Sequence, residues 1–445
     1  MERGRTHHAT TYQMRMINPY GFHKERHCCR IKAFIFADDA PRVEQGKSRR
    51  EGTCSYSGNK WKMKVSGLPA RHGGPGINSY LLPLISQLEH MHGLANNLSR
   101  ELVAATEFSY YELTDLDLSG SGRKWEECGL RIATAFFYKD AGIATLGGIT
   151  QTCRAIPDFL SKSFSARYLR NCENEVKVMS LHAGLKRASP RRDSLLVLDK
   201  DIASVTLHES VGHPLEAESI MLKGNYIRPF LNSGRPIMDS RFRVYDAPAL
   251  PDWGAVRRDA YGDPRRSLDI IRGGYIRNVY SDRLSSAALK TTCNPGSARH
   301  EFLSGIPRSR ISTLVLEDSN YLRVPKSEDI LPAMRHLASS YGASGNEIVF
   351  LDGCSGGEGN MLKGYFRVIP HRAWIYKKNA IFALPATSFE GSMPAFLSAL
   401  RAGAGELTRG DSSYCSKFGQ AVPVSSLTHR YLMLAWESGL DIKRI

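Results

Sequence analysis

The sequence LLVLDKDIASVTLHESVGHPLE, residues 195–216, places a short apolar run directly before a helical pattern that ends in two histidines. The run Leu195–Leu198 predicts a buried strand, because four consecutive apolar residues leave neither face for solvent. Asp199 or Asp201 has the residue type of a helix N-cap, so a helix is expected to begin near Ile202. A strand that leads straight into a helix is therefore the centre of the predicted fold.

The two histidines, His208 and His213, lie five residues apart at the end of this helix, and Glu209 follows the first of them. The familiar zinc-protease pattern has its histidines four residues apart on one helix face. On a regular helix, five residues at about 100° each point the two rings about 140° apart. Gly212 and Pro214 weaken regular helix here, so we expect a π-type bulge or kink that turns both imidazoles toward one metal ion. The alternative is that both are ordinary helix-end residues.

A catalytic zinc site also needs a third protein ligand and one open coordination position. The sequence alone leaves several candidates for that ligand, namely Glu216, Glu218, His300, Cys354 and Cys415. A lone cysteine in a loop is more often an inert thiol than a ligand, so the spacing does not decide among them.

Around this centre the sequence predicts an α+β protein whose C-terminal half is a largely antiparallel sheet. We expect three parts: a basic, mostly irregular extension over 1–75, an N-terminal domain over 76–190, and a C-terminal domain over 191–445. The predicted helices are 81–102, 149–171 with an interruption at Pro157, 326–339 and 392–402. The predicted strands are 130–137, 143–146, 267–271, 275–280, 311–316, 347–351, 365–369 and 373–376, with a linker at 186–192.

The composition is that of a globular protein. The chain has 445 residues, of which 42% are hydrophobic and 23% charged, and this balance excludes wholesale disorder. No apolar stretch approaches the roughly 18 residues of a membrane-spanning helix, so no membrane association is expected. Nine scattered cysteines do not form a disulfide scaffold. They suit free thiols in a reducing cytoplasm.

The basic charge is concentrated at the N-terminal end. Residues 1–75 hold 15 lysines and arginines against 6 acidic residues, a net +9 of the total +16. Such a segment can bind nucleic-acid phosphates, but no recognition module is visible and a solvated extension is favoured. A zinc site in this segment is disfavoured, because the adjacent Cys28-Cys29 lacks the spacer of a zinc knuckle. The other residues of that hypothetical site are His23, His27 and Cys54.

A serine hydrolase is a further alternative, since Gly353-Cys354-Ser355-Gly356-Gly357 fits the Gly-x-Ser-x-Gly pattern. A nucleophile elbow needs a helix directly after the serine, whereas the sequence continues into another predicted strand. A hairpin turn is therefore the favoured interpretation of these glycines.

Several motifs, taken in order, resemble the TldD/PmbA (TldD/TldE) family of metallopeptidases. They span about residues 125–430. The residues that carry the resemblance are Val197-Leu198-Asp199, the His208-to-Glu216 segment, Ala298-Arg299-His300-Glu301, Ser355-Gly356-Gly357-Glu358, and Cys415 with Gly419-Gln420-Ala421-Val422-Pro423-Val424.

The resemblance implies one Zn²⁺ per chain, bound by His208, His213 and Cys415, with Glu209 as general base. It implies an N-terminal α/β domain, a C-terminal catalytic domain, and a TldD-like subunit that carries the metal motif and pairs with a PmbA/TldE-like partner or forms a homo-oligomer. The substrates implied are short or unfolded peptides in the cytoplasm, bound as an added β-strand. A catalytically silent scaffold subunit is the alternative, and the intact four-residue set speaks against it.

Overall fold

The computed structural model describes residues 8–17, 23–36, 53–58, 61–66, 81–99, 101–117, 124–138 and 147–445, except 224, 232, 290–295, 301–305, 326–329 and 341–346. In the four strands before residue 81, only the backbone pairing is described. The chain divides into two units. The first is formed chiefly by Met1–Val178, and the second by Met179–Glu301 with Ile306–Ile445.

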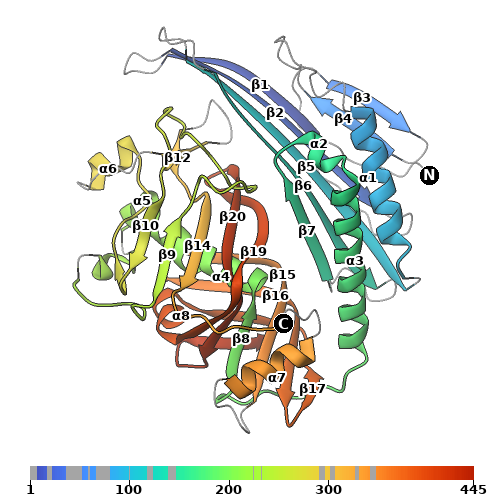
Figure 1. The fold of residues 1–445 in the computed structure, drawn as a ribbon. Helices are drawn as coiled ribbons and strands as arrows, with labels where there is room; N and C mark the ends of the chain where they lie inside the picture. The colour runs from blue at the N-terminus through green and yellow to red at the C-terminus, as the bar shows by residue number, and fades with distance from the viewer. Residues whose placement is uncertain are drawn as a thin grey trace. The chain divides into compact units, whose positions relative to one another are not determined.

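The first unit is built on a five-stranded antiparallel sheet in the order β1-β2-β5-β6-β7 (Figure 1). Its strands are β1 His8–Ile17, β2 His23–Phe36, β5 Leu102–Asp117, β6 Lys124–Tyr138 and β7 Gly147–Cys153. A separate hairpin pairs β3 Thr53–Gly58 with β4 Trp61–Ser66. The helices are α1 Leu81–Asn96, α2 Ile156–Phe159 and α3 Lys162–Ala183, whose last residues belong to the second unit.

Alternation in β6 explains how this sheet acquires a buried face. Leu130, Ile132, Thr134 and Phe136 are all buried, as expected when every second side chain of a strand points to one side. Thr134 and Tyr168 of α3 share a hydrogen bond of 2.6 Å between their hydroxyl oxygens. This face of the sheet is therefore covered by helix α3.

The expectation of a mostly irregular chain over 1–75 is wrong for β1 to β4, because β1 and β2 are two strands of the main sheet. Charged and polar residues hide the alternation there, while Thr10, Thr11 and Tyr12 still carry the β-propensity of strand residues. The expected strand 143–146 lies outside the described residues.

Two predicted helices in this unit also differ from the structure. The helix expected over 81–102 ends at Asn96, and Leu102 begins strand β5. The segment expected to be helical over 149–171 starts as strand β7, and Pro157 lies in the first turn of α2, where proline is tolerated because that turn lacks intrahelical N–H partners. The expected interruption at Pro157 is therefore wrong, because the proline lies at the start of a helix.

The second unit contains a 12-stranded sheet with the order β11-β10-β9-β14-β20-β8-β15-β16-β18-β21, to which β17 and β19 add through β16 and β20. Among the strand pairs that the structure describes in this sheet, only β8 with β15 and β14 with β20 are parallel, so the expected α+β fold with a largely antiparallel C-terminal sheet is confirmed. The strands are β8 Leu195–Asp199, β9 Phe242–Asp246, β10 Leu268–Arg272, β11 Tyr275–Ile276, β14 Thr313–Asp318, β15 Ile348–Asn360, β16 Tyr365–Lys377, β17 Ala380–Ala383, β18 Thr387–Ser392, β19 Leu400–Lys417, β20 Gln420–Ala435 and β21 Leu440–Arg444.

Helices and short strands complete this unit. They are α4 Lys200–Leu207, α5 Ala217–Met221, α6 Arg283–Leu289, α7 Ile330–Ser340 and α8 Met393–Ala399, with the pair β12 Ala298–Arg299 and β13 Arg308–Ser309. The sequence missed β18 to β21. It also placed a hairpin turn at Gly353–Gly357, whereas β15 continues through these glycines with a bulge and ends at Asn360.

The core of the second unit lies where β8 and α4 meet. Every residue of β8 is buried, and Ile202, Leu207 and Val211 are each 0% exposed in the cluster that contains Leu196 and Leu198. The continuous apolar run of β8 thus sits in the middle of the sheet, and the helix that follows it is anchored in the core. Among the described residues, none of the helices is long and apolar enough to span a bilayer.

Candidate metal centre

Asp199 fixes the start of the helix that carries the two histidines. Its Oδ1 accepts the backbone N–H groups of Asp201 at 3.0 Å and Ile202 at 2.9 Å, which is the N-cap expected from the sequence. Its Oδ2 accepts the N–H of Gly353 in β15 at 3.0 Å. One carboxylate therefore ties α4 to the glycine-rich strand. The pKa of Asp199 lies well above its usual value, because burial and the neighbouring Asp201 both disfavour its charge.

The helix changes its winding at the histidines, as the spacing predicted. α4 ends at Leu207, residues His208–Gly212 form a π-helical turn, and His213–Leu215 form a 3₁₀ turn. The two imidazole centroids lie 4.6 Å apart with their planes at 79°. Both side chains are buried. The wider turn thus brings together two rings that a regular α-helix would point apart.

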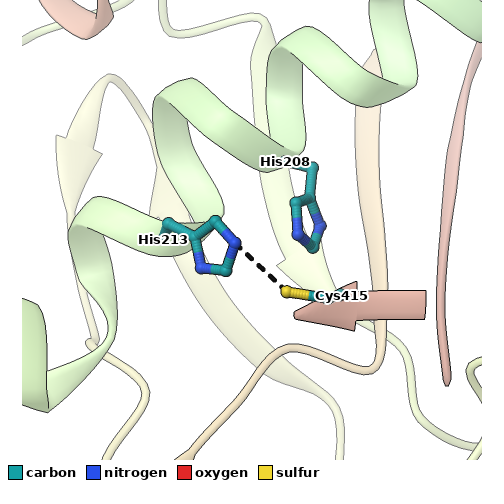
Figure 2. Close-up of side chains that lie close together, drawn as sticks. All are labelled: His208, His213 and Cys415. Atoms are coloured by element: carbon teal, nitrogen blue, oxygen red, sulfur yellow. Dashed lines mark hydrogen bonds between the residues drawn. The ribbon is translucent and has the colours of Figure 1, made fainter. Parts of the chain in front are cut away.

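Cys415, near the end of β19, completes a cluster with these rings (Figure 2). Its Sγ lies 3.1 Å from His213 Nε2. Among the described residues, His208, His213 and Cys415 form the group whose potential ligand atoms all lie within 4.8 Å of one another. At Zn–N bonds of about 2.0–2.1 Å and Zn–S bonds of about 2.3 Å, a tetrahedral site separates a nitrogen from a sulfur ligand by about 3.5 Å. The donor types and their spacing therefore fit a zinc ion with one position left open.

A buried charge network supports His213 from behind. His213 Nδ1 lies 3.0 Å from Glu216 Oε2, and Glu216 is 0% exposed. Lys417 donates to the same carboxylate and to Ser219 Oγ, the latter at 2.7 Å. Arg310 Nε lies 3.5 Å from Glu216 Oε1. The carboxylate thus orients the ring so that Nε2 faces the cluster, an arrangement typical of metal-binding histidines.

Electrostatics favour a thiolate in this cluster. Burial alone would raise the pKa of the Cys415 thiol, but the rings of His213 and His208 outweigh it and hold the pKa well below its usual value. Burial likewise lowers the pKa of His213, but Cys415 and Glu216 together raise it to about 10. The pKa of Glu216 lies below its usual range despite burial, because Lys417 and His213 stabilise its charge. A metal ion binds thiolate and neutral imidazole, so its binding would release the His213 proton.

Glu209 lies against the glycine-rich part of β15. A Cβ atom placed on Gly357 would lie 3.3 Å from Glu209 Cγ, and one on Gly359 would lie 3.0 Å from Glu209 Oε2. Among the described residues, no hydrogen bond or ion pair engages the Glu209 carboxylate. The glycines therefore leave room for the carboxylate of the residue that directly follows His208.

The other candidate ligands are used elsewhere. Glu216 bonds to His213 from behind the ring, and Glu218 Oε1 accepts the N–H of Ser309 at 2.9 Å. Cys354 Sγ is directed to Gly356 O at 3.6 Å. These three and His300 lie outside the described three-residue cluster. Ser355 lies within strand β15 with no helix after it, so the structure provides no nucleophile elbow.

Arg310 and Lys417 also belong to the site, although neither is predicted from the sequence. Lys417 had a usable signal, because residues two apart on a strand share a face and it follows Cys415 by two. Arg310 had none, since more than a hundred residues separate it from Cys415 and it belongs to no motif. Tertiary structure alone brings its guanidinium to the sulfur.

Comparisons with known proteins identify a family for the C-terminal part of the chain. Residues 193–423 match the model of the PmbA/TldA metallopeptidase C-terminal domain. The chain is 25% identical over 239 residues to a metalloprotease of Archaeoglobus fulgidus, covering 54% of this chain and 51% of that protein. It is also 25% identical over 234 residues to a metalloprotease TldD homolog of Buchnera aphidicola, covering 52% and 44%. The chain thus spans about half the length of these curated relatives.

A solved structure extends the likeness to the fold of the whole chain. TldE from Thermococcus kodakarensis matches with a TM-score of 0.58 at 12% identity, covering 98% of this chain and 94% of that one. At that identity the likeness concerns the fold alone. The matched C-terminal domain model includes the two histidines and Cys415 and covers more than half of the sequence. The chain therefore belongs to the TldD/PmbA family of metallopeptidases.

Proposed function

We propose that this chain is a zinc-dependent peptidase that hydrolyses short or unfolded peptides, with His208, His213 and Cys415 as metal ligands and Glu209 as general base. The observation that carries this proposal is the convergence of two imidazoles and a thiolate within 4.8 Å. Glu209 follows His208 in the chain, and its carboxylate has no described hydrogen-bond or ion-pair partner. Two nitrogen donors and one soft sulfur donor favour Zn²⁺ over Mg²⁺ or Mn²⁺.

The residues divide the chemistry among them. A bound zinc ion supplies Lewis-acid polarisation of a water molecule and of the scissile carbonyl. Glu209 accepts the proton of that water and delivers it to the nitrogen of the leaving amine. Glu216 holds His213 through Nδ1, which keeps Nε2 directed toward Cys415 Sγ, where the metal would bind.

An open strand edge supports peptide substrates. β15 pairs with β8 only as far as Leu351, while its pairing with β16 continues to Asn360. Beyond Leu351, no strand of the described chain pairs with the edge that β8 leaves. A peptide added there would be held through its backbone and would pass the glycines next to Glu209, with loose side-chain selectivity.

The catalytic domain, the cellular location and the partner subunit are further parts of this proposal. We assign catalysis to the C-terminal domain over 191–445 and place the protein in the cytoplasm. An N-terminal domain that starts at residue 76 is not proposed, because β1 and β2 are strands of the same sheet as β5, β6 and β7. The boundary between the two structural units follows Val178 and so lies N-terminal to the domain boundary expected at residue 190. The proposed partner is a PmbA/TldE-like subunit, with a second copy of this chain as the alternative, because a TldE structure shares the fold.

Metal content tests the ligand set directly. Zinc per chain should be about one in the wild type and well below one in His208→Ala, His213→Ala and Cys415→Ser. His182→Ala is a matched control, since His182 bonds to the carbonyl of Ala373 and packs on Trp374, away from the cluster. A chelator should abolish peptide hydrolysis, and zinc should restore it. Equal zinc in all five proteins would show that the ligand assignment is wrong.

A further inference from the structure

Arg310 is a buried arginine that contacts both halves of the cluster. Its Nη2 donates to Cys415 Sγ at 2.9 Å and to Cys415 O at 2.7 Å. Its Nε lies 3.5 Å from Glu216 Oε1, the carboxylate behind His213. The side chain is 1% exposed. One guanidinium therefore spans from the sulfur of one proposed ligand to the hydrogen-bond partner of another.

The backbone holds this arginine in place. Its N–H donates to Ser297 O at 2.9 Å, and its carbonyl accepts from Arg265 Nη2 at 2.9 Å. The next residue, Ile311, packs against the π turn at Gly212. A guanidinium buried this deeply costs several kcal/mol unless its partners compensate, and those partners are the thiolate and the buried carboxylate. The arginine is thus held by backbone and side-chain contacts of the protein itself.

We infer that Arg310 is a positioning residue of the metal centre, and that its N–H group weakens electron donation from the Cys415 sulfur to the metal. This inference rests on the proposed function. A thiolate ligand donates more charge than a carboxylate and blunts the Lewis acidity of the metal. A hydrogen bond to a metal-bound sulfur withdraws part of that charge, as in other sulfur-ligated centres. Arg310 therefore offsets the main electronic drawback of the cysteine ligand.

A merely structural role for Arg310 makes a different prediction. The bond to the Cys415 carbonyl and the 3.5 Å contact to the Lys417 carbonyl hold strand β19, and their loss would lower stability without altering the electronic properties of the sulfur. The test therefore needs a signal that reports the sulfur itself. The sulfur-to-cobalt charge-transfer band of the Co²⁺-substituted protein provides one, because its energy falls as the sulfur becomes a stronger donor.

The experiment compares Co²⁺-substituted wild type with four variants. Arg310→Met removes the donor, and Arg310→Lys keeps a cation that can reach the sulfur. Lys417→Met removes another partner of Glu216 and leaves the sulfur contact intact. Arg372→Met removes a similarly buried arginine whose partner is Asp352. Absorption spectra, the rate of metal release to a chelator and thermal unfolding are recorded for each.

We expect the charge-transfer band to move to longer wavelength in Arg310→Met, to return toward its wild-type position in Arg310→Lys, and to stay in place in Lys417→Met and Arg372→Met. Metal affinity should fall about 10- to 100-fold in Arg310→Met, the usual range for residues that support a metal ligand. If Arg310→Met unfolds, Arg310→Lys still decides the matter, because its altered donor should leave a smaller shift to longer wavelength that Arg372→Met lacks. In that case an unchanged band in Arg310→Lys overturns the inference. An unchanged band in both Arg310 variants overturns the inference. A wild-type protein that shows no such band overturns the ligand set instead.

Discussion

The backbone N–H of His213 donates a hydrogen bond to the carbonyl of His208, five residues earlier in the chain. This bond closes one wide π turn between helix α4 and the 3₁₀ turn that follows it. The histidines are five residues apart where the familiar zinc-protease pattern has four, and the wide turn compensates for this extra residue. Without it, the rings would diverge by about 140° on a regular helix. The geometry of the cluster therefore depends on local backbone conformation as much as on the ligands themselves.

Gly212 gives this turn its space, so Gly212→Ala should destabilise it. A Cβ atom there would lie 2.3 Å from Ile311 Cδ1, although the φ of −58° suits any residue. Overpacking of this kind costs about 1–3 kcal/mol, which exceeds the gain in helix propensity from replacing glycine. We expect a lower unfolding temperature and less zinc per chain.

Ile311→Val tests whether this clash explains the effect of Gly212→Ala, because valine lacks the Cδ1 atom that would clash. Alone it should cost about 0.5–1.5 kcal/mol. The double variant should be more stable than the sum of the two single effects, and its zinc content should recover. Strict additivity in urea unfolding would show that Ile311 is not what makes the glycine necessary.

Glu209→Gln tests the general base separately from metal binding. The amide keeps the size of the side chain next to Gly359 but cannot accept the proton of the attacking water. Peptide hydrolysis should fall about 10²- to 10⁴-fold, the usual contribution of a general base, while zinc content stays at the wild-type level. Glu406→Gln on β19, an exposed position, is the control. Turnover near wild type in Glu209→Gln would remove the residue from the mechanism.

The two histidines and the turn between them could be predicted from the sequence, whereas the residues that surround them could not. The π turn followed from Gly212 and Pro214, because both residues act on the backbone within a few positions. Cys415 was one of five candidates for the third ligand, and only the resemblance selected it, since no spacing rule links residues two hundred apart. Arg310 could not be predicted, because its contacts arise from long-range packing. In the fold, the apolar run of β8 was plain, whereas β1 and β2 were hidden by their charged residues.

Acid pH tests the charge cluster around Glu390 on β18. Burial alone would raise the pKa of Glu390, but hydrogen bonds from Lys443 and Tyr365 outweigh it and lower the pKa to about 2. The unfolded chain has a pKa of about 4.3, so the folded state binds fewer protons between these values. The stabilisation by Glu390 is therefore complete above about pH 5 and is lost as the pH falls toward 2.

Glu390→Gln should accordingly lower the free energy of unfolding by about 1 kcal/mol at pH 7, since Lys443 is half exposed, and the deficit should shrink at pH 4 and further at pH 3. Urea unfolding of both proteins at the three pH values measures this. A deficit that is independent of pH would mean that lost packing, and not charge, explains the effect. Glu406→Gln should show no deficit at any pH.

Gly359→Ala tests whether the glycines of β15 position Glu209. The new Cβ atom would lie 2.4 Å from Met361 Cε and 3.0 Å from Glu209 Oε2. The end of the methionine can move aside, whereas the carboxylate would have to shift by a few tenths of an ångström. A misplacement of about 1 Å at a catalytic group can cost about 100-fold in rate, so for this smaller shift we expect a loss of up to about 10-fold in kcat with unchanged zinc. Met361→Ala and the double variant separate the two contacts. Only the methionine contact is relieved in the double variant, so its hydrolysis should stay low, and recovery to the wild-type rate would show that Glu209 tolerates a side chain at position 359.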